Sequence, residues 1–266
     1  MRFPLLEIDR LTCGYGDKMI LSNINLTVDT GKIVTIIGPN GSGKTTLLRA
    51  VSRILAPRKG KVLLSGVDIA EMTPEKRARQ IAVVGQLREP VAMTVRQYVL
   101  LGRIPFYSRF QLIETDRDRA LADRYIGLTG IADCQDKLLN ELSGGQMQLA
   151  AIARALTQEP RLLLLDEPTA HLDITHQVRI LDLIRRLNQE LSITVLMVLH
   201  DLNLASEYSH RLMLLKGGHQ AACGTPDQVF TCKIVERVYD TTVFVGKNPL
   251  TGRPHIFLVS GEMKTE

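Results

Sequence analysis

Eight residues of this chain have the types and the spacing needed to bind phosphate groups. Gly38–Thr45 reads Gly-Pro-Asn-Gly-Ser-Gly-Lys-Thr and fits the pattern Gly-x-x-x-x-Gly-Lys-Ser/Thr in full. Its glycines let the backbone curl until successive N–H groups point inward at phosphate oxygens. Lys44 supplies a point charge to the β- and γ-phosphates, and the Thr45 hydroxyl can ligate Mg²⁺. The segment therefore predicts an ATP site.

The residues on either side of this loop favour the same interpretation. Ile33–Ile37 is a continuous apolar run, typical of a strand buried on both faces, and Thr45–Val51 is predicted to be a helix. The helix would add its positive dipole end to the loop. The alternative is a glycine-rich turn that matches by chance, and the predicted strand and helix argue against it.

Two acidic residues follow another apolar run. Leu162–Leu165 predicts a buried strand, and Asp166 and Glu167 come directly after it. Such strand ends lie at the ligand crevice of an α/β sheet. We expect Asp166 to hold Mg²⁺, directly or through water, and Glu167 to activate the attacking water as general base. Two solvated carboxylates at a strand end are the alternative.

A histidine stands at a third predicted strand end. His200 follows the apolar run Ile193–Leu199 and is expected at the same sheet edge, where it could reach the γ-phosphate. The other five histidines have no such placement and are interpreted as surface or packing residues.

The segment Leu142–Gln146 predicts a helix start that can bind an anion. Ser143 is expected to cap the helix, and Gln146 completes a capping box. The amides of Gly144 and Gly145 leave the helix N-terminus open. Taken alone, the segment fits a well-capped helix equally well.

Strand and helix patterns predict the frame that positions these residues. Strands are expected over Leu5–Leu11, Ile24–Val28, Lys61–Leu64 and Arg211–Leu215, and helices from Thr73, from Thr94, over Asp116–Ile126 and over His176–Leu191. In Asp116–Ile126, Ala120, Leu121 and Tyr125 are expected to form the apolar face. Two β-containing segments thus bracket a helical insertion, which favours a mainly parallel α/β sheet with an antiparallel N-terminal layer.

Composition and charge exclude several classes of protein. The chain has 266 residues, of which 45% are hydrophobic, which argues against a disordered chain. Trp is absent and aromatic residues make up 5%, which argues against a nucleic-acid surface of stacked rings. The net charge of +5 suits a nucleotide or an anionic membrane face, or a mildly basic soluble protein.

Cysteine spacing and hydropathy argue against two further features, a zinc site and a membrane-spanning segment. The four cysteines form no CxxC pair, which argues against a zinc site. No apolar run is long enough to cross a bilayer. A role at a membrane would therefore be that of a peripheral subunit.

Over nearly its whole length the chain resembles the ATPase subunits of ABC transporters. Gly38–Thr45, Gln86, Leu142–Gln146, Asp166-Glu167 and His200 occur in that family's order. The resemblance implies a P-loop NTPase (RecA-like) α/β core with an N-terminal antiparallel β layer and an inserted helical subdomain. Within one domain over residues 1–266, residues 1–88 and 157–266 would form the core with its β subdomain, and residues 89–156 the helical subdomain.

The resemblance also implies roles for single residues. Catalytic roles would fall to Glu167, His200, Gln86 and Lys44, and Mg²⁺ would be held by Thr45, Gln86 and Asp166. ATP would be contacted by Gly38, Pro39, Asn40, Gly41, Ser42, Gly43, Lys44, Thr45 and Thr46, and Tyr15 would stack on adenine unless it is only a strand-end residue. Ser143, Gly144, Gly145 and Gln146 match the signature that contacts the γ-phosphate bound by the opposite subunit, and Asp173 matches the loop that links the two sites.

Partners follow from the same resemblance. In this family two ATPase subunits pair head to tail around two ATP molecules, so a homodimer is expected, on two integral membrane permease subunits. An extracytoplasmic substrate-binding protein is expected as well, and no nucleic acid. Leu87–Phe110 would form much of the permease-docking surface, with the subunit peripheral at the cytoplasmic face of the inner membrane.

A narrower resemblance is to ATPases of importers for iron-siderophore, haem and cobalamin complexes. It lies in Thr94–Arg96 with Leu101–Pro105, in His171–Gln177 and in Asn248–Pro254. Met147 and Leu149 stand where many members carry Arg, Gly85 where Pro is frequent, and His171 where small residues are common. None of these departures removes a catalytic group, so an active enzyme is expected.

Two alternatives stay open at this point. One is a soluble ABC-type ATPase of the DNA-repair or iron–sulfur assembly kind, and the other is a subunit of a split exporter. DNA-repair relatives carry zinc-binding CxxC pairs, which this chain lacks. Chromosome-organising relatives have a very long coiled coil between the phosphate loop and the signature, whereas here about a hundred residues separate the two segments. No residue identifies the cargo, because the ATPase subunit does not touch it.

Overall fold

The computed structural model describes residues 4–85, 92–108, 111, 113–259 of the chain. It contains two compact units. Unit 1 comprises Met1–Glu71 and Thr194–Glu266, and unit 2 comprises Met72–Ile193. The division into a core and a helical subdomain at residues 89–156 stays a prediction.

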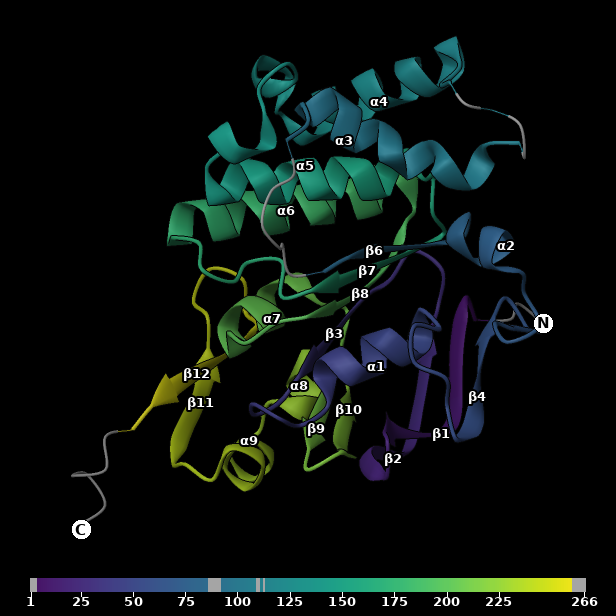
Figure 1. Cartoon of the computed structure of the whole chain (residues 1–266). Helices are drawn as coiled ribbons and strands as arrows, with labels where there is room; N and C mark the ends of the chain where they lie inside the picture. Colours follow the sequence, from purple (N-terminus) through teal and green to yellow (C-terminus); the bar gives the residue numbers. More distant parts are fainter. Residues whose placement is uncertain (1–3, 86–91, 109–110, 112, 260–266) are drawn as a thin grey trace. The chain divides into compact units, whose positions relative to one another are not determined.

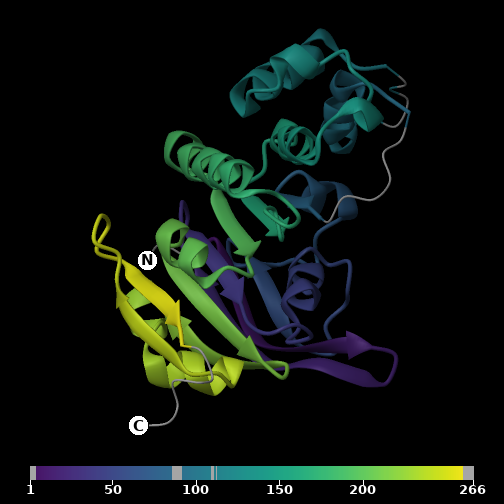
Figure 2. The ribbon, with the colours of Figure 1, turned by 90° about the vertical axis from the view of Figure 1, so that its left-hand side faces the viewer.

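Unit 1 contains an antiparallel sheet of strand order β2-β1-β4-β5. Its strands are β1 (Leu6–Tyr15), β2 (Lys18–Val28), β4 (Lys59–Leu64) and β5 (Val67–Asp68). β1 and β2 form a long hairpin that closes where Tyr15 pairs with Lys18 (Figure 2). Both strands are longer than predicted, because polar residues interrupt the apolar alternation outside Leu5–Leu11 and Ile24–Val28. The expected antiparallel N-terminal layer is confirmed.

A second set of strands in unit 1 carries the phosphate loop. It has the order β10-β9-β3-β8 and consists of β3 (Ile33–Ile37), β8 (Thr194–Val198), β9 (Arg211–Lys216) and β10 (His219–Gly224). β3 runs parallel to both β8 and β9. Every residue of β3 and β8 is buried, as their unbroken apolar runs predict. α1 (Lys44–Val51) follows β3, and α7 (Leu202–Tyr208) follows β8.

The C-terminal part of unit 1 holds elements that the sequence patterns did not predict. These are α9 (Cys232–Tyr239) and the hairpin of β11 (Val243–Lys247) and β12 (Pro254–Leu258). The preceding α8 (Pro226–Val229) instead follows a helix-start pattern, Thr225-Pro226. The hairpin lies beside α7, with Asn203 bonded to both backbone groups of Ile256 (Figure 1). The stretch Asn248–Pro254 comprises the hairpin loop and the first residue of β12, and a hydrogen bond of 2.9 Å from Asn248 to Glu207 fastens it to α7.

Unit 2 contains two parallel strands and most of the helices. Its elements are α2 (Pro74–Ala78), β6 (Ile81–Val84), α3 (Val95–Leu100), η1 (Leu101–Phe106), α4 (Asp116–Thr129), η2 (Ala132–Cys134), η3 (Leu139–Glu141), α5 (Gly144–Thr157), β7 (Leu162–Asp166) and α6 (Ile174–Leu191). Thr73 and Thr94 cap α2 and α3, as predicted. α3, α4 and α5 pack on one another (Figure 1). The expected helical stretch is confirmed.

The predicted apolar face of α4 is wrong in part. Ala120 is exposed and Leu121 half-buried, whereas Tyr125 is buried as expected. The buried face also includes Asp118, which the charge pattern had placed outside. An acidic residue can occupy this face because Arg103 and Thr115 satisfy its oxygens.

Arg103 is the centre of a buried polar cluster in unit 2. Its side chain is 5% exposed, and its Nε donates to Asp118 at 2.8 Å. Its Nη1 donates to the carbonyl of Thr157 at 2.9 Å and to Glu159 at 3.1 Å. The guanidinium also stacks on Phe106, 3.8 Å from the ring centre. Arg103 therefore fixes η1 to α4 and to the end of α5.

We predict that Asp118→Ala destabilises unit 2 by about 3–5 kcal/mol, because it leaves a buried guanidinium without its closest counter-charge. Denaturant unfolding of the full chain measures this. Arg119→Ala is the control, since Arg119 is half exposed in its ion pair with Glu114 and should cost less than about 1 kcal/mol. An Asp118→Ala cost as small as that of the control would contradict the prediction.

The same pair predicts a pH dependence of stability. Burial alone would raise the pKa of Asp118, but hydrogen bonds from Thr115 and Arg103 hold this pKa below its ordinary value of 3.8. A lowered pKa stabilises the folded state above the unfolded-state pKa, and this contribution disappears as the pH falls through the folded-state pKa. The stability difference between wild type and Asp118→Asn should therefore narrow in acid below the ordinary Asp pKa.

Candidate functional site

The phosphate loop leaves the end of β3 and enters α1 through residues with left-handed backbone. Gly38 has φ 151°, Gly41 76° and Gly43 102°. At Gly38 space is limiting as well, because an added Cβ would lie 2.2 Å from the carbonyl oxygen of Leu215. α1 begins at Lys44, one residue earlier than predicted, and it has no side-chain cap. The N–H groups of its first turn are thus not covered by a capping side chain.

Lys44 and Ser42 turn this loop into an anion site. Lys44 is 5% exposed, and its Nζ donates to the carbonyls of Gly38 at 2.8 Å and Pro39 at 3.1 Å. The Ser42 hydroxyl is buried and has no hydrogen-bond partner among the described residues. A buried hydroxyl without a partner costs about 1–3 kcal/mol. A phosphate oxygen bound in the loop would remove that cost.

His200 lies at the same edge of unit 1 as the phosphate loop. β3 and β8 are parallel and in register from Ile33 with Val195 to Ile36 with Val198, and Leu199 donates to the carbonyl of Ile36. The residues that follow each strand therefore emerge side by side. The neighbouring Asp201 is the N-cap of α7, with Oδ1 2.8 Å from the amide of Leu204.

Tyr15 is placed in the same unit. It ends β1 and is 42% exposed, and its hydroxyl accepts from Arg49 of α1 at 3.0 Å. An exposed ring tied to the helix that follows the phosphate loop can stack on a flat ligand.

Tyr239, near the end of α9, is a residue at the phosphate loop that sequence reasoning missed. Burial raises the pKa of its hydroxyl, and a hydrogen bond from the N–H of Gly38 opposes this. Lys216, at the end of β9, in turn holds Asp240 at 2.7 Å. The C-terminal helix thus supports the first residue of the loop. Its short pattern gave no signal of this, since the contact joins residues far apart in the chain.

The acidic pair lies in unit 2, at the end of β7. Asp166 is the last residue of the strand and Glu167 is the next. Glu167 has φ 55°, a left-handed conformation that a non-glycine residue adopts at a cost of about 1–3 kcal/mol. Such strain concentrates at functional sites. β6 runs parallel to β7, but Gln86, which follows β6, lies outside the described residues.

The signature begins α5 as predicted. Ser143 is the N-cap: its hydroxyl accepts from the amide of Gln146 at 3.3 Å, and its own amide donates to Gln146 Oε1 at 3.0 Å. Buried Cys134 accepts from the other end of the Gln146 amide at 3.4 Å. The sulfur therefore fixes which way this amide points, a contact that sequence reasoning missed.

Asp173 is the N-cap of α6, where its Oδ1 accepts from the amide of His176 at 2.8 Å. This bond, followed by one to the His176 ring, lowers the pKa of Asp173. In sum, unit 1 holds Tyr15, Gly38–Thr46 and His200, and unit 2 holds the signature, Asp166, Glu167 and Asp173.

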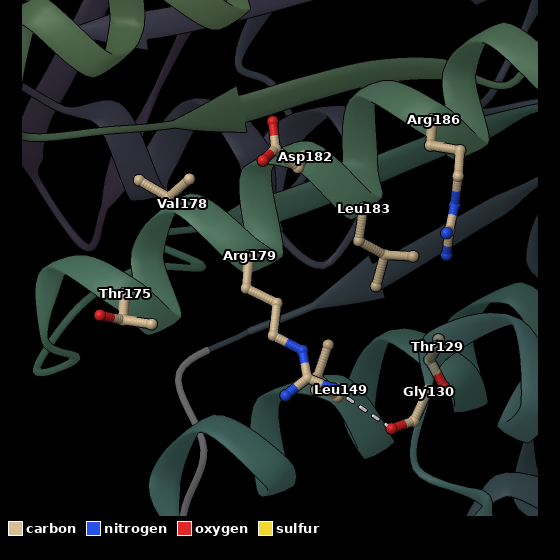
Figure 3. A pocket seen from close by; sticks show the side chains of 9 residues that line it. All are labelled: Thr129, Gly130, Leu149, Thr175, Val178, Arg179, Asp182, Leu183 and Arg186. Carbon is tan, nitrogen blue, oxygen red and sulfur yellow. Dashed lines mark hydrogen bonds between the residues drawn. The ribbon is translucent and has the colours of Figure 1, made fainter.

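Unit 2 also contains a pocket of about 520 Å³ that none of the predicted site residues lines. Figure 3 shows its wall: Thr129, Gly130, Leu149, Thr175, Val178, Arg179, Asp182, Leu183 and Arg186. Arg179 and Arg186 of α6 donate to the carbonyls of Gly130 and Leu128 at the end of α4. α4 has no basic residue in its last turn. The arginines supply the positive charge that stabilises a helix C-terminus, so their role here is structural.

Known proteins match this chain over more than half of its length. The family described as ABC transporter matches residues 21–170. The probable siderophore transport system ATP-binding protein YusV of Bacillus subtilis is 41% identical over 255 residues, which cover 96% of this chain and 92% of YusV. Within the described residues no helix is long and apolar enough to cross a membrane.

Two solved structures share the fold. A chain assigned to the metal-chelate type of ABC transporter, in an inward-facing conformation, superposes with a TM-score of 0.85 at 25% identity and covers 98% of this chain and 99% of its own. The dimeric bacterial ABC transporter cassette MJ0796 does so with a TM-score of 0.72 at 29% identity, covering 83% and 98%. The family match and the similarity to YusV together show that the chain belongs to the ABC transporter family, as one of its ATP-binding subunits that hydrolyse ATP.

Proposed function

We propose that this chain hydrolyses ATP to power the import of an iron-siderophore or related metal-chelate compound. The phosphate loop carries the first half of the proposal, because the buried Ser42 hydroxyl and the enclosed Lys44 ammonium both suit phosphate oxygens. The cargo class rests on relatives, since YusV is a probable siderophore transporter component and a structural neighbour is of the metal-chelate type. An exporter is also among the structural neighbours, but this chain covers only 39% of it, whereas it covers 92% of YusV.

Nucleotide binding is assigned to residues of unit 1. The backbone N–H groups between Gly38 and Thr46, of which Pro39 has none, surround the β- and γ-phosphates, and the Lys44 ammonium offsets part of their charge. Tyr15 stacks on the adenine ring. Because the Arg49 bond holds the Tyr15 hydroxyl beside α1, the ring is already oriented before ATP arrives.

Mg²⁺ fits the donors that the chain offers. Magnesium in nucleotide sites is held by one or two protein oxygens together with phosphate oxygens and water. Thr45 and Asp166 are donors of this type, and Gln86 is assigned as a third. When bound, the ion would neutralise charge on the β- and γ-phosphates.

Hydrolysis is assigned to Glu167 and His200. Glu167 takes a proton from the attacking water. It follows the last residue of β7 directly and has a left-handed backbone. His200, at the strand edge beside the phosphate loop, contacts the γ-phosphate. The cap on α7 by Asp201 holds the segment that bears His200 in place.

The complete site needs a second copy of the chain. Ser143–Gln146 would contact the γ-phosphate held by the other subunit, and Asp173 would link the two sites. A related cassette is dimeric, which supports this arrangement. An open helix N-terminus such as that of α5 binds phosphate through its amides and dipole.

The partners in the membrane are proposed to be two permease subunits, with an extracytoplasmic binding protein on the far side. Leu101 and Ile104 of η1 are 39% and 54% exposed and lie in the stretch Leu87–Phe110 expected to dock. Gly102 and Arg103 between them are buried. The subunit would thus sit peripherally at the cytoplasmic face, presenting the apolar side of η1.

Lys44→Ala should weaken ATP binding about tenfold to a hundredfold, because a hydrogen bond to a charged group contributes about 1.5–3 kcal/mol. Calorimetric titration of the full chain with ATP measures this. The control is Lys61→Ala, an exposed lysine of β4 in the same unit, which should bind like wild type. Equal affinity of Lys44→Ala and wild type would remove the nucleotide assignment from this loop.

Glu167→Gln should bind ATP but lose turnover by at least about a hundredfold, since it removes a general base. We expect this variant to accumulate as an ATP-bound dimer in analytical ultracentrifugation. Glu190→Gln, on the exposed end of α6, is the control and should turn over normally. Normal turnover by Glu167→Gln would rule out this residue as the base.

The cargo is tested with the complex. The chain and its permease are co-expressed and reconstituted in proteoliposomes. Their ATPase activity should rise when a binding protein loaded with an iron-siderophore is added, but not when the same binding protein is added without ligand. Failure to co-purify with any integral membrane protein would contradict the transport role.

A further inference from the structure

His176 joins the loop that contains Asp173 to the signature of the same chain. It is the third residue of α6, and its Nδ1 lies 2.8 Å from Asp173 Oδ1. The lowered pKa of Asp173 keeps that carboxylate ionised, so it can only accept hydrogen bonds. Nδ1 therefore carries a proton and donates to Asp173. This bond fixes the plane of the imidazole ring.

The opposite edge of the ring rests on Gly145. A Cβ added to Gly145 would lie 2.5 Å from Cδ2, 3.2 Å from Cγ and 3.3 Å from Nε2 of His176. Next to it, a Cβ on Gly144 would lie 3.5 Å from Leu172. The segment from Leu172 to His176 thus packs directly against the first turn of α5.

Gly145 is a glycine for reasons of space. It lies within α5 and does not have the left-handed backbone that requires glycine at Gly43. A glycine in a helix costs about 0.5–1 kcal/mol relative to alanine. The benefit that offsets this cost is room for the His176 ring.

Helix capping alone does not account for the ring. Asp173 caps α6 through the backbone amide of residue 176, and any side chain at that position would supply this amide. The ring adds two further contacts, to Asp173 and to Gly145. These contacts connect two segments that serve different parts of the site.

We infer that His176 is a positioning residue for ATP hydrolysis, which sets the position of the signature turn relative to Asp173. This rests on the proposed function, in which the signature contacts the γ-phosphate of the opposite subunit. His176 acts as a spacer: when Asp173 moves, its bond to the ring transmits the displacement to Gly145. The loop and the signature of one chain therefore move as one piece.

The test compares four variants of the full chain: His176→Ala, His176→Phe, Gly145→Ala and the double variant Gly145→Ala/His176→Ala. His176→Ala should lower kcat about tenfold with ATP affinity unchanged, because it misplaces the signature and not the phosphate loop. His176→Phe keeps the ring but not its bond to Asp173, and should retain more of kcat than His176→Ala. His219→Ala, an exposed histidine of β10, is the control with normal kcat.

The double variant is decisive. Gly145→Ala should lower kcat about a hundredfold, since its methyl group collides with the ring. The double variant, which also lacks the ring, should have a kcat at least about fivefold higher than that of Gly145→Ala, because the effects of residues in direct contact are not additive. The inference is overturned if the losses of the single variants multiply in the double variant, or if His176→Ala has normal kcat. Thermal unfolding of each variant checks that it folds. If an alanine variant does not fold, kcat of His176→Phe is compared with kcat of the wild type instead.

The variant Ser143→Arg distinguishes failure of the proposed function from failure of the inference about His176. If this variant keeps normal turnover, and forms the ATP-bound dimer in the Glu167→Gln background, the signature does not act on ATP and the proposed function fails. If Ser143→Arg abolishes both while His176→Ala is normal, only the inference about His176 fails.

Discussion

The approach of Gly38 to the carbonyl oxygen of Leu215 is the constraint on which the nucleotide site depends. The two residues lie at the ends of β3 and β9, and no side chain fits at position 38 because its Cβ would lie 2.2 Å from that oxygen. β3 is buried on both faces, so it cannot shift to relieve such a contact. The loop must therefore leave the sheet at one place and in one direction. The position of Lys44 over its own loop and the orphaned Ser42 hydroxyl follow from this geometry.

Glycine serves two different purposes in this chain. Gly41 and Gly43 provide left-handed backbone in the phosphate loop, which is a local need that the sequence pattern reports directly. Gly102 and Gly145 lie in helical segments and provide space: a Cβ on Gly102 would lie 2.2 Å from the carbonyl oxygen of Arg154. The second purpose depends on a neighbour distant in sequence, so only the structure identifies it. A glycine in a helix is thus a useful indicator of close packing.

The sequence predicted those features whose cause is local. Apolar runs predicted three strands, which precede the phosphate loop, Asp166 and His200. Capping pairs predicted the helix starts at Thr94 and Ser143. Both kinds of pattern act over only a few residues. It did not predict the burial of Asp118, the support of Gly38 by Tyr239 or the ring of His176 on Gly145. Each of these depends on a partner more than a dozen residues away in the chain. The hairpin β11–β12 was missed because a loop with proline and glycine conceals its short strands.

Helix capping separates the two kinds of phosphate contact proposed here. Within the described residues, α2 to α7 each have a side chain that accepts from the first turn, whereas α1 has none. A cap on α1 would compete with phosphate for the same amides. At α5 the competition is limited, because the Ser143 hydroxyl takes the amide of Gln146 and not those of Gly144 and Gly145. No side-chain cap therefore competes with phosphate at α1, whereas the cap of α5 occupies part of its first turn and stabilises that helix without a ligand. Stability without ligand is what a signature needs if it binds and releases the nucleotide of another subunit in each cycle.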